Sequence, residues 1–337
     1  MYSKSEKNYK TTVQLRIENR KSYYRNMAEA NSTRDEKLNK SVDIYCSADF
    51  AEEIHNQLRH LSVINILLSV TAFLGNTLIL IALRKESSLN PPSKLLLRSL
   101  AATDLCAGLI SLPLLAMFGL SLLSERWNVC LFAAFASSIA GYSFSGVTLL
   151  TMTAISVDRL LALLLGLRYR QVVTLKRMRL VVIAFWLEST AVAAVQLWNF
   201  AVLRWYSNSV IPLCVATSTF CYIKIFCALT HRRLQTHTRT ANQLDMARYK
   251  NAVSSALWLQ LTLVICYLPF AVVNAVIVST VPPESTIPSS LFTVRLYAIV
   301  LTHLNSSLNP ILYCWKIRPL RQAVKSTIRQ LLCHLLS

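Results

Sequence analysis

The chain has 337 residues, of which 54% are hydrophobic and only 15% are charged. Soluble domains usually have about a quarter of their residues charged, so this composition, with its long apolar runs, indicates a polytopic membrane protein. The net charge of +19 does not indicate a nucleic-acid binder, because much of the basic excess lies in short segments between the apolar runs.

Residues 1–57 are polar, mixed in charge and without helical periodicity, so we expect a mostly disordered extracellular tail. They contain no basic segment followed by an apolar one, and a cleaved signal peptide is therefore not expected. Asn31-Ser32-Thr33 and Asn39-Lys40-Ser41 are N-glycosylation sequons. Asn31 and Asn39 are the predicted glycosylation sites.

Seven apolar segments are long enough to cross a bilayer, which takes about 20 residues each. We expect helices near residues 61–83, 95–122, 130–163, 180–200, 206–230, 252–279 and 290–315. The basic loops alternate along the chain, so they fall on one side of the membrane, and the positive-inside pattern places the C-terminus in the cytoplasm. The predicted fold is an all-α membrane protein, with a seven-transmembrane helix bundle over residues 58–316.

Residues 317–337 predict a short amphipathic eighth helix and a cytoplasmic tail. The apolar side chains that recur at helical spacing are Leu320, Val324, Ile328 and Leu331, and the basic ones between them are Arg321, Lys325 and Arg329. Such a helix lies on the inner leaflet, in contact with membrane lipids. Cys333 near its end is a palmitoylation site or, as the alternative, a free thiol.

Isolated polar groups stand inside several apolar segments. Asp104 is the only acid of the second one, and an unpaired carboxylate in hydrocarbon is protonated or recruits a cation. The third ends in Asp158-Arg159, and the seventh carries Asn309-Pro310. Ionisable groups in a bilayer usually mark function, and a proline opens the hydrogen-bond ladder of its helix.

The ordered set of these features resembles the rhodopsin-like (class A) G-protein-coupled receptors over roughly residues 60–330. The landmarks are Gly75-Asn76, Leu100 to Asp104, Trp127 before Cys130, Asp158-Arg159, Trp186, Pro212, Leu268-Pro269 and Asn309 to Tyr313. The resemblance implies a plasma-membrane receptor that binds an extracellular ligand and activates heterotrimeric G proteins. It implies neither an enzyme nor a nucleic-acid partner.

The same resemblance implies functional side chains within the bundle. An allosteric sodium ion would be held by Asp104, Thr148, Asn305, Ser306 and Asn309, and no other cofactor is expected. The alternative is a water-filled polar network without a specific ion. G-protein coupling and switching would use Asp158, Arg159, Tyr222, Tyr267, Pro269, Asn309, Pro310 and Tyr313.

Several positions depart from the family pattern. Leu160 follows Arg159 where the family usually has tyrosine, and Tyr267 stands where it usually has tryptophan. The inner end of the sixth segment reads Arg248-Tyr249-Lys250, without the acid that often restrains the arginine. The alternative role of Arg159 is a snorkelling side chain paired with its neighbouring acid.

The ligand is predicted from the outer halves of the segments. Ala298 to Ser306 closely resembles the seventh helix of adenosine receptors, and Asn274, five residues after Pro269, matches them too. The resemblance implies an adenosine-like ligand bound by Tyr142, Ser145, Asn274, Thr302 and His303. Gly141 replaces the aspartate of amine receptors. The alternative is that these polar groups only hydrogen-bond between helices.

The second outer loop, around Leu203 to Ser209, is short and has no cysteine to pair with Cys130. In this it resembles melanocortin and cannabinoid receptors, so a peptide- or lipid-activated receptor is the alternative. Cys46 is the other outward cysteine, which leaves a Cys46–Cys130 bridge open. A transporter or lipid scramblase is the alternative of another class, although the chain lacks the repeated halves common in transporters.

Overall fold

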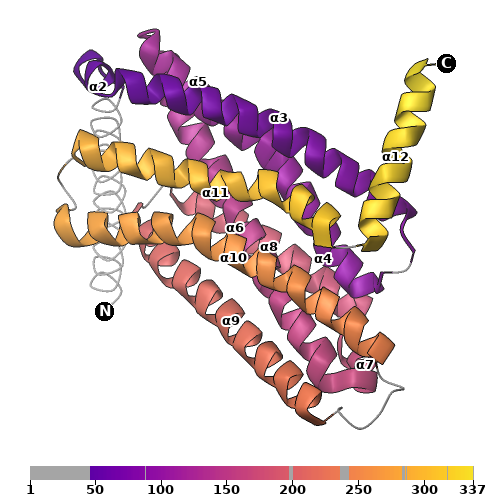
Figure 1. Cartoon of the computed structure of the whole chain (residues 1–337). Helices are drawn as coiled ribbons and strands as arrows, with labels where there is room; N and C mark the ends of the chain where they lie inside the picture. Colours follow the sequence, from indigo (N-terminus) through magenta and orange to yellow (C-terminus); the bar gives the residue numbers. More distant parts are fainter. Residues whose placement is uncertain are drawn as a thin grey trace, which may run out of the picture.

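The computed structural model describes residues 46–87, 89–196, 200–235, 243–282, 285, 287–316 and 318–336, and the predicted glycosylation sites Asn31 and Asn39 lie outside them. The described part is helical throughout (Figure 1). Its long helices are α3 (His55–Lys85), α4 (Pro91–Cys106) continued by α5 (Leu112–Leu123), α6 (Trp127–Leu165), α8 (Leu175–Val195), α9 (Phe200–Gln235), α10 (Gln243–Thr280) and α11 (Ser289–Lys316). We refer to the two ends of the bundle by the short helix found at each, α2 (Ala48–Glu53) or α12 (Arg318–Leu336).

The bundle confirms the predicted seven-helix fold, with α4 and α5 counted as one. Within the described residues, six helices are long and apolar enough to cross a membrane, and α11 is the seventh long helix. The buried polar residues of α11 account for its lower hydropathy; they are Thr302, His303, Asn305, Ser306, Ser307 and Asn309. The helix that bears most of the predicted site is thus the least apolar one.

The second membrane span contains a π-helical bulge, Ala107–Ser111, between α4 and α5. The sequence predicts only a kink at Pro113. Because proline lacks an N–H and its ring crowds the carbonyl four residues earlier, the preceding turn widens. The hydroxyl of Ser69 in α3 donates to the Gly108 carbonyl at 2.7 Å and so satisfies one group of the bulge. The bulge rotates Ser111 into the bundle, where it is buried.

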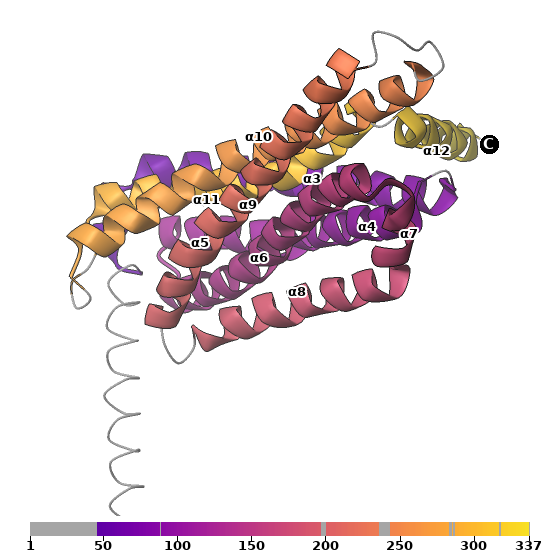
Figure 2. The ribbon, with the colours of Figure 1, turned by 90° about the horizontal axis from the view of Figure 1, so that it is seen from below.

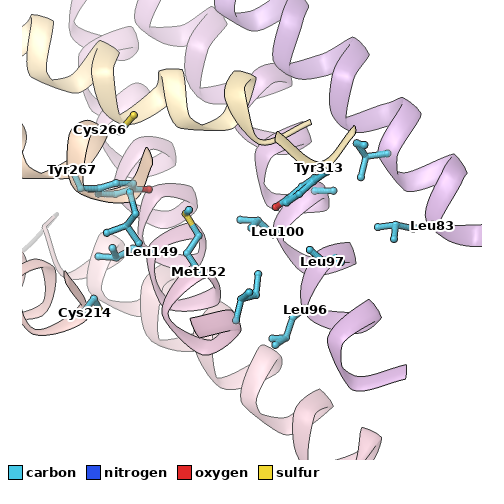
Figure 3. Close-up of a cluster of buried hydrophobic side chains, with 14 of the residues drawn as sticks. Leu83, Leu96, Leu97, Leu100, Leu149, Met152, Cys214, Cys266, Tyr267 and Tyr313 are labelled. Carbon is cyan, nitrogen blue, oxygen red and sulfur yellow. The ribbon is translucent and has the colours of Figure 1, made fainter. Parts of the chain in front are cut away.

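A hydrophobic core joins α3, α4, α6, α10 and α11 from the middle of the bundle to the α12 end. Figure 3 shows Tyr267 beside Leu149 and Met152, and the ring of Tyr313 next to Leu97 and Leu100. Burial of these side chains brings helices far apart in sequence together, and it fixes the positions of the polar residues that lie between them.

The segment before the first long helix forms a cap of residues 46–54 on the α2 end (Figure 1). A disulfide joins Cys46 to Cys130 at the start of α6, which confirms the bridge that the sequence left open. Phe50 and Ile54 are buried, and the Phe50 ring packs edge-on against Phe292 of α11 with centroids 5.1 Å apart. The predicted domain boundary at residue 58 therefore falls inside α3, and the tail next to it is packed.

The C-terminal helix α12 confirms the amphipathic helix expected over residues 317–337. Leu320 and Val324 are buried against the core, whereas Arg321 and Lys325 are exposed. Figure 1 shows α12 leaving the α11 direction at an angle and crossing the end of α3, where Lys85 donates a hydrogen bond to Gln330.

Peptide mapping without reduction should recover a linked Cys46–Cys130 peptide. Replacing Cys46 with serine should lower the thermal stability of the purified protein, because the bridge closes a loop with a sequence separation of 84 residues and such bridges typically contribute about 2–5 kcal/mol. Cys333→Ser is the matched control, since Cys333 is a free, exposed thiol. Equal melting temperatures for all three proteins would contradict a structural role of the cap.

Candidate functional site

The carboxyl group of Asp104 lies fully buried in the centre of the bundle. Its Oδ1 accepts hydrogen bonds from the hydroxyls of Ser306 at 2.8 Å and Thr148 at 3.2 Å. Its Oδ2 accepts one from the amide of Asn309 at 2.8 Å. Three of the four residues predicted to hold a sodium ion together with Asp104 therefore donate hydrogen bonds to its carboxyl group.

The fifth predicted residue, Asn305, points elsewhere. Its amide nitrogen lies 3.4 Å from the sulfur of Met152. Among the described residues, the buried side-chain oxygens of Asn305, Asn309 and nearby Asn76 have no hydrogen-bond partner. This region therefore has more acceptor oxygens than donors, which suits a small cation or water molecules.

Asp158 at the α12 end is bound mainly by residues other than Arg159. It accepts hydrogen bonds from the Ser93 hydroxyl at 2.8 Å and from the Tyr169 hydroxyl at 2.5 Å, whereas Arg159 Nε is 4.0 Å away. Ser93 belongs to α4 and Tyr169 to the short helix α7 (Tyr169–Val172). Neither donor was predicted from the sequence. The position of Tyr169, shortly after Asp158-Arg159 in the chain, was the one available sign of its contact with Asp158. Arg159 is thus loosely held, with 27% of its side chain exposed.

The chain turns sharply after α6 at Gly166, whose φ of +50° favours glycine. The turn leaves Leu167 with 98% of its surface exposed, and Arg168 beside it is exposed as well. Leu167 lies just beyond the end of α6, the helix that carries Arg159, and a protein that binds at this end could bury it.

Tyr267 and Tyr313 are both buried within the core. The Tyr267 hydroxyl donates to the Ser145 carbonyl at 3.2 Å, so this tyrosine ties α10 to α6 just before Pro269. The Tyr313 hydroxyl has no partner among the described residues. Tyr222 of α9 is also buried, and no hydrogen bond joins it to Tyr313 in the described part of the chain.

Two tryptophans hold α10 to α11 toward the α12 end. The rings of Trp258 and Trp315 lie with centroids 5.0 Å apart, and the Lys316 ammonium is 3.7 Å from the centroid of Trp315. A cation over an aromatic face attracts it electrostatically. Arg159 takes no part in this contact. The sequence alone did not predict it, because Trp258 and Trp315 are far apart in the chain and only folding brings them together.

His303 is hydrogen-bonded on both ring nitrogens. Its Nδ1 lies 2.9 Å from the Ile299 carbonyl, which can only accept, so Nδ1 carries the proton and Nε2 accepts from the Ser111 hydroxyl at 2.8 Å. Ser111 comes from the π bulge. Gly141 of α6 faces the pair, because a Cβ there would lie 3.6 Å from Ser111 Oγ.

The other predicted ligand contacts lie on α6, α10 and α11. Tyr142 packs against Phe270, with centroids 6.3 Å apart, and its hydroxyl accepts from Arg295 Nη2 at 3.3 Å. Thr302 donates to its own helix at Ile299. Asn274, one turn beyond Phe270, is buried and has no hydrogen bond to any described residue. Of the five predicted residues, Asn274 is the only one with a side-chain amide.

The model of the 7 transmembrane receptor (rhodopsin family) matches residues 75–208. The adenosine receptor A2b of Gallus gallus is 25% identical over 316 residues, covering 80% of this chain and 88% of the relative. The adenosine receptor A3 of Ovis aries is 27% identical over 291 residues, covering 77% and 86%. The adenosine receptor A2b of Homo sapiens is 25% identical over 312 residues, covering 80% and 90%.

The matched segment contains Asp104, Cys130 and Asp158-Arg159, and the fold closes these features into one helix bundle. Similarity to the adenosine receptors extends over about four-fifths of the chain. In sequence over residues 75–208 and in its helical bundle, the chain is therefore similar to the rhodopsin family of seven-transmembrane receptors, the class A G-protein-coupled receptors, which is a family of receptors and not of enzymes.

Proposed function

We propose that this receptor binds an adenosine-like small molecule between α6, α10 and α11 near the α2 end. We place that end outside the cell and the α12 end in the cytoplasm, where heterotrimeric G proteins bind. The similarity to adenosine receptors of several vertebrates supports the ligand class. The disulfide-linked cap supports the orientation, because disulfides persist in the oxidising extracellular space.

The free amide of Asn274 is the observation that carries the ligand assignment. Asn274 is 8% exposed and its amide has no hydrogen bond to a described residue, so both its donor and its acceptor are available to a ligand. A side-chain amide presents a donor and an acceptor together, and the edge of a purine offers the complementary pair. The Tyr142 and Phe270 rings beside it supply the apolar surface that a heterocycle needs.

The hydroxyl groups of a ribose would meet the Ser111–His303 pair. Nε2 of His303 is an acceptor, and at present it accepts from the Ser111 hydroxyl of the receptor itself. A ligand hydroxyl would replace Ser111 as that donor or bind to Ser111 itself. In either case the ligand supplies an uncharged donor. Gly141 agrees with this, because a carboxylate at that position would favour a cationic amine instead.

At the cytoplasmic end, Arg159 would contact the G protein. Ser93 and Tyr169 hold Asp158 in place, so little of the attraction between the acid and Arg159 has to be broken. Leu167 and the exposed basic residues after it would extend the contact. The exposed thiol of Cys333 lies on α12 and would carry a palmitoyl chain into the inner leaflet.

A sodium ion would bind at Asp104. The excess of acceptor oxygens over donors around the carboxylate fits a small cation, and Ser306, Thr148 and Asn309 would contribute ligands or orient the acid. The ion would supply the positive charge that one buried carboxylate requires. Asn305 would join by turning from Met152.

A lipid- or peptide-activated receptor is the second candidate. The α2 cap favours it, because Phe50 and Ile54 of the cap join an apolar cluster with Leu296 and Val300 of α11. Such a surface over the bundle suits an apolar ligand more than a nucleoside. In that case Arg295, which reaches Tyr142, would be the main polar contact.

Asp104→Asn should abolish the effect of sodium on agonist affinity. The substitution removes the charge but keeps an acceptor oxygen for Ser306 and Thr148. Agonist binding to membranes, measured in sodium and in an impermeant organic cation at equal ionic strength, should differ several-fold for the unmutated receptor and little for the variant. An unmutated receptor that is indifferent to sodium would contradict the ion site.

The receptor should activate G protein without ligand, since the acid that often restrains the arginine is missing from Arg248-Tyr249-Lys250. The Trp258–Trp315 contact is a restraint of another kind, so Trp258→Ala should raise the basal signal further. Nucleotide exchange by membranes at matched surface expression is the measurement, and Arg159→Ala is the inactive control. A basal signal equal to that of cells without receptor would refute this expectation.

Adenosine should stimulate nucleotide exchange, and Asn274→Ala should reduce its potency roughly 5- to 150-fold, because removing one partner of a buried hydrogen bond costs about 1–3 kcal/mol. His303→Ala should act similarly. Arg295→Ala separates the two ligand classes, since a peptide or lipid ligand should depend on Arg295 and little on Asn274. No response to adenosine, or unchanged potency in both pocket variants at normal surface expression, would reject the adenosine-like pocket.

A further inference from the structure

Arg295 is a cation without an acidic partner at the α2 end of the bundle. Among the described residues it forms no ion pair, and its Nε is buried without a hydrogen-bond partner. It lies six residues after the first residue of α11, about 9 Å along the helix axis. A charged side chain within a membrane helix is costly, and it usually marks a site where a partner of opposite charge binds.

The guanidinium group of Arg295 points into the bundle. Its Nη2 donates to the Tyr142 hydroxyl of α6 at 3.3 Å, and the Tyr142 ring packs against Phe270 of α10. Figure 2 shows α10 and α11 side by side, with α6 lying between them and α8. An arginine that only escapes from hydrocarbon turns its charge outward to the membrane surface. That simpler role does not account for Arg295, which reaches inward from α11 to α6.

The helices around the proposed ligand site supply no negative charge to it. α11 has no acidic residue, and the only acids of α6 and α10 are Asp158 and Asp245, which lie toward the α12 end. The acids of the α2 cap and of the connection before α6 are exposed, and none of them forms an ion pair with Arg295 in the described part of the chain. Arg295 therefore gives the site a positive charge that no residue there neutralises.

We propose that Arg295 binds an anionic group of the ligand, a phosphate or a carboxylate. A guanidinium has five N–H donors in a planar fork that matches two oxygens of such a group, and Tyr142 accepts from only one of them. Asn274, buried one turn beyond Phe270, would bind another part of the same molecule. The inference rests on the ligand site proposed above and narrows its ligand to an anion, in the first place a nucleoside monophosphate.

The test uses the purified receptor in phosphatidylcholine nanodiscs and two pairs of compounds, each differing by one phosphate. The pairs are adenosine with adenosine monophosphate, and monooleoylglycerol with oleoyl lysophosphatidic acid, so a nucleotide is distinguished from a lipid. The concentration dependence of the melting temperature gives the affinity for each compound. In at least one pair the phosphate should raise the affinity roughly 10- to 150-fold, the range expected for hydrogen bonds to a charged group.

Arg295→Gln should remove this gain in affinity, because it keeps a polar side chain but loses the charge and the fork. Arg59→Gln is the matched control and should retain the gain, since Arg59 is an exposed arginine at the same end of the bundle. If Arg295→Gln does not fold, the unmutated receptor provides a second measurement. High salt should reduce the gain from the phosphate through screening and leave the affinity for the neutral compounds nearly unchanged.

No gain from the phosphate in either pair, or an equal gain in Arg295→Gln, would overturn the anion site. If adenosine binds in that case, the adenosine-like ligand stands and only the anionic group is wrong. A gain confined to the lipid pair would keep the anion site and reject the nucleoside.

Discussion

The carboxyl group of Asp104 sets the arrangement of this bundle, because hydrocarbon offers it no hydrogen bonds. Its three donors come from α6 and α11, while the acid itself belongs to α4. Three helices are therefore held at fixed relative positions by one buried group. A cation bound at Asp104, as proposed above, would alter the balance among all three helices and so act on both ends of the bundle.

The distortions of the helices lie where function is proposed. The π bulge before Pro113 turns Ser111 toward His303, and the proline in α10 lies two residues from Tyr267, which bonds to α6. A regular helix would satisfy its own backbone but could not present these side chains inward. Each distortion is stabilised locally, by the Ser69 hydroxyl at the bulge and by core packing at Tyr267. Such local irregularities suit positions where helices move relative to one another.

Hydrophobic periodicity was enough to predict the seven helices, since hydrocarbon leaves few alternatives. The residues around Asp104 were predicted from the resemblance to a receptor family, and Asn305 among them turns to Met152 instead. The π bulge could not be predicted, because Pro113 indicates that the helix is kinked but not that the preceding turn is π-helical. Ser93 and Ser111 escaped notice because a lone serine or threonine hydroxyl in a helix usually bonds its own backbone, as Thr190 does at 2.6 Å. Tyr169 escaped notice because it lies between two predicted spans, and only the fold brings its hydroxyl to Asp158.

The α2 cap and the Tyr142–Arg295 bond act on the same two helices. The cap is covalently attached to α6 through Cys130 and packs on α11 through Phe292, and Arg295 of α11 reaches Tyr142 of α6 from below it. Separation of α6 and α11 at this end would strain both connections. A ligand bound between Tyr142 and Asn274, as proposed above, would disturb the Arg295 contact or the cap. Either change would act on α11, which also carries the Asp104 donors Ser306 and Asn309.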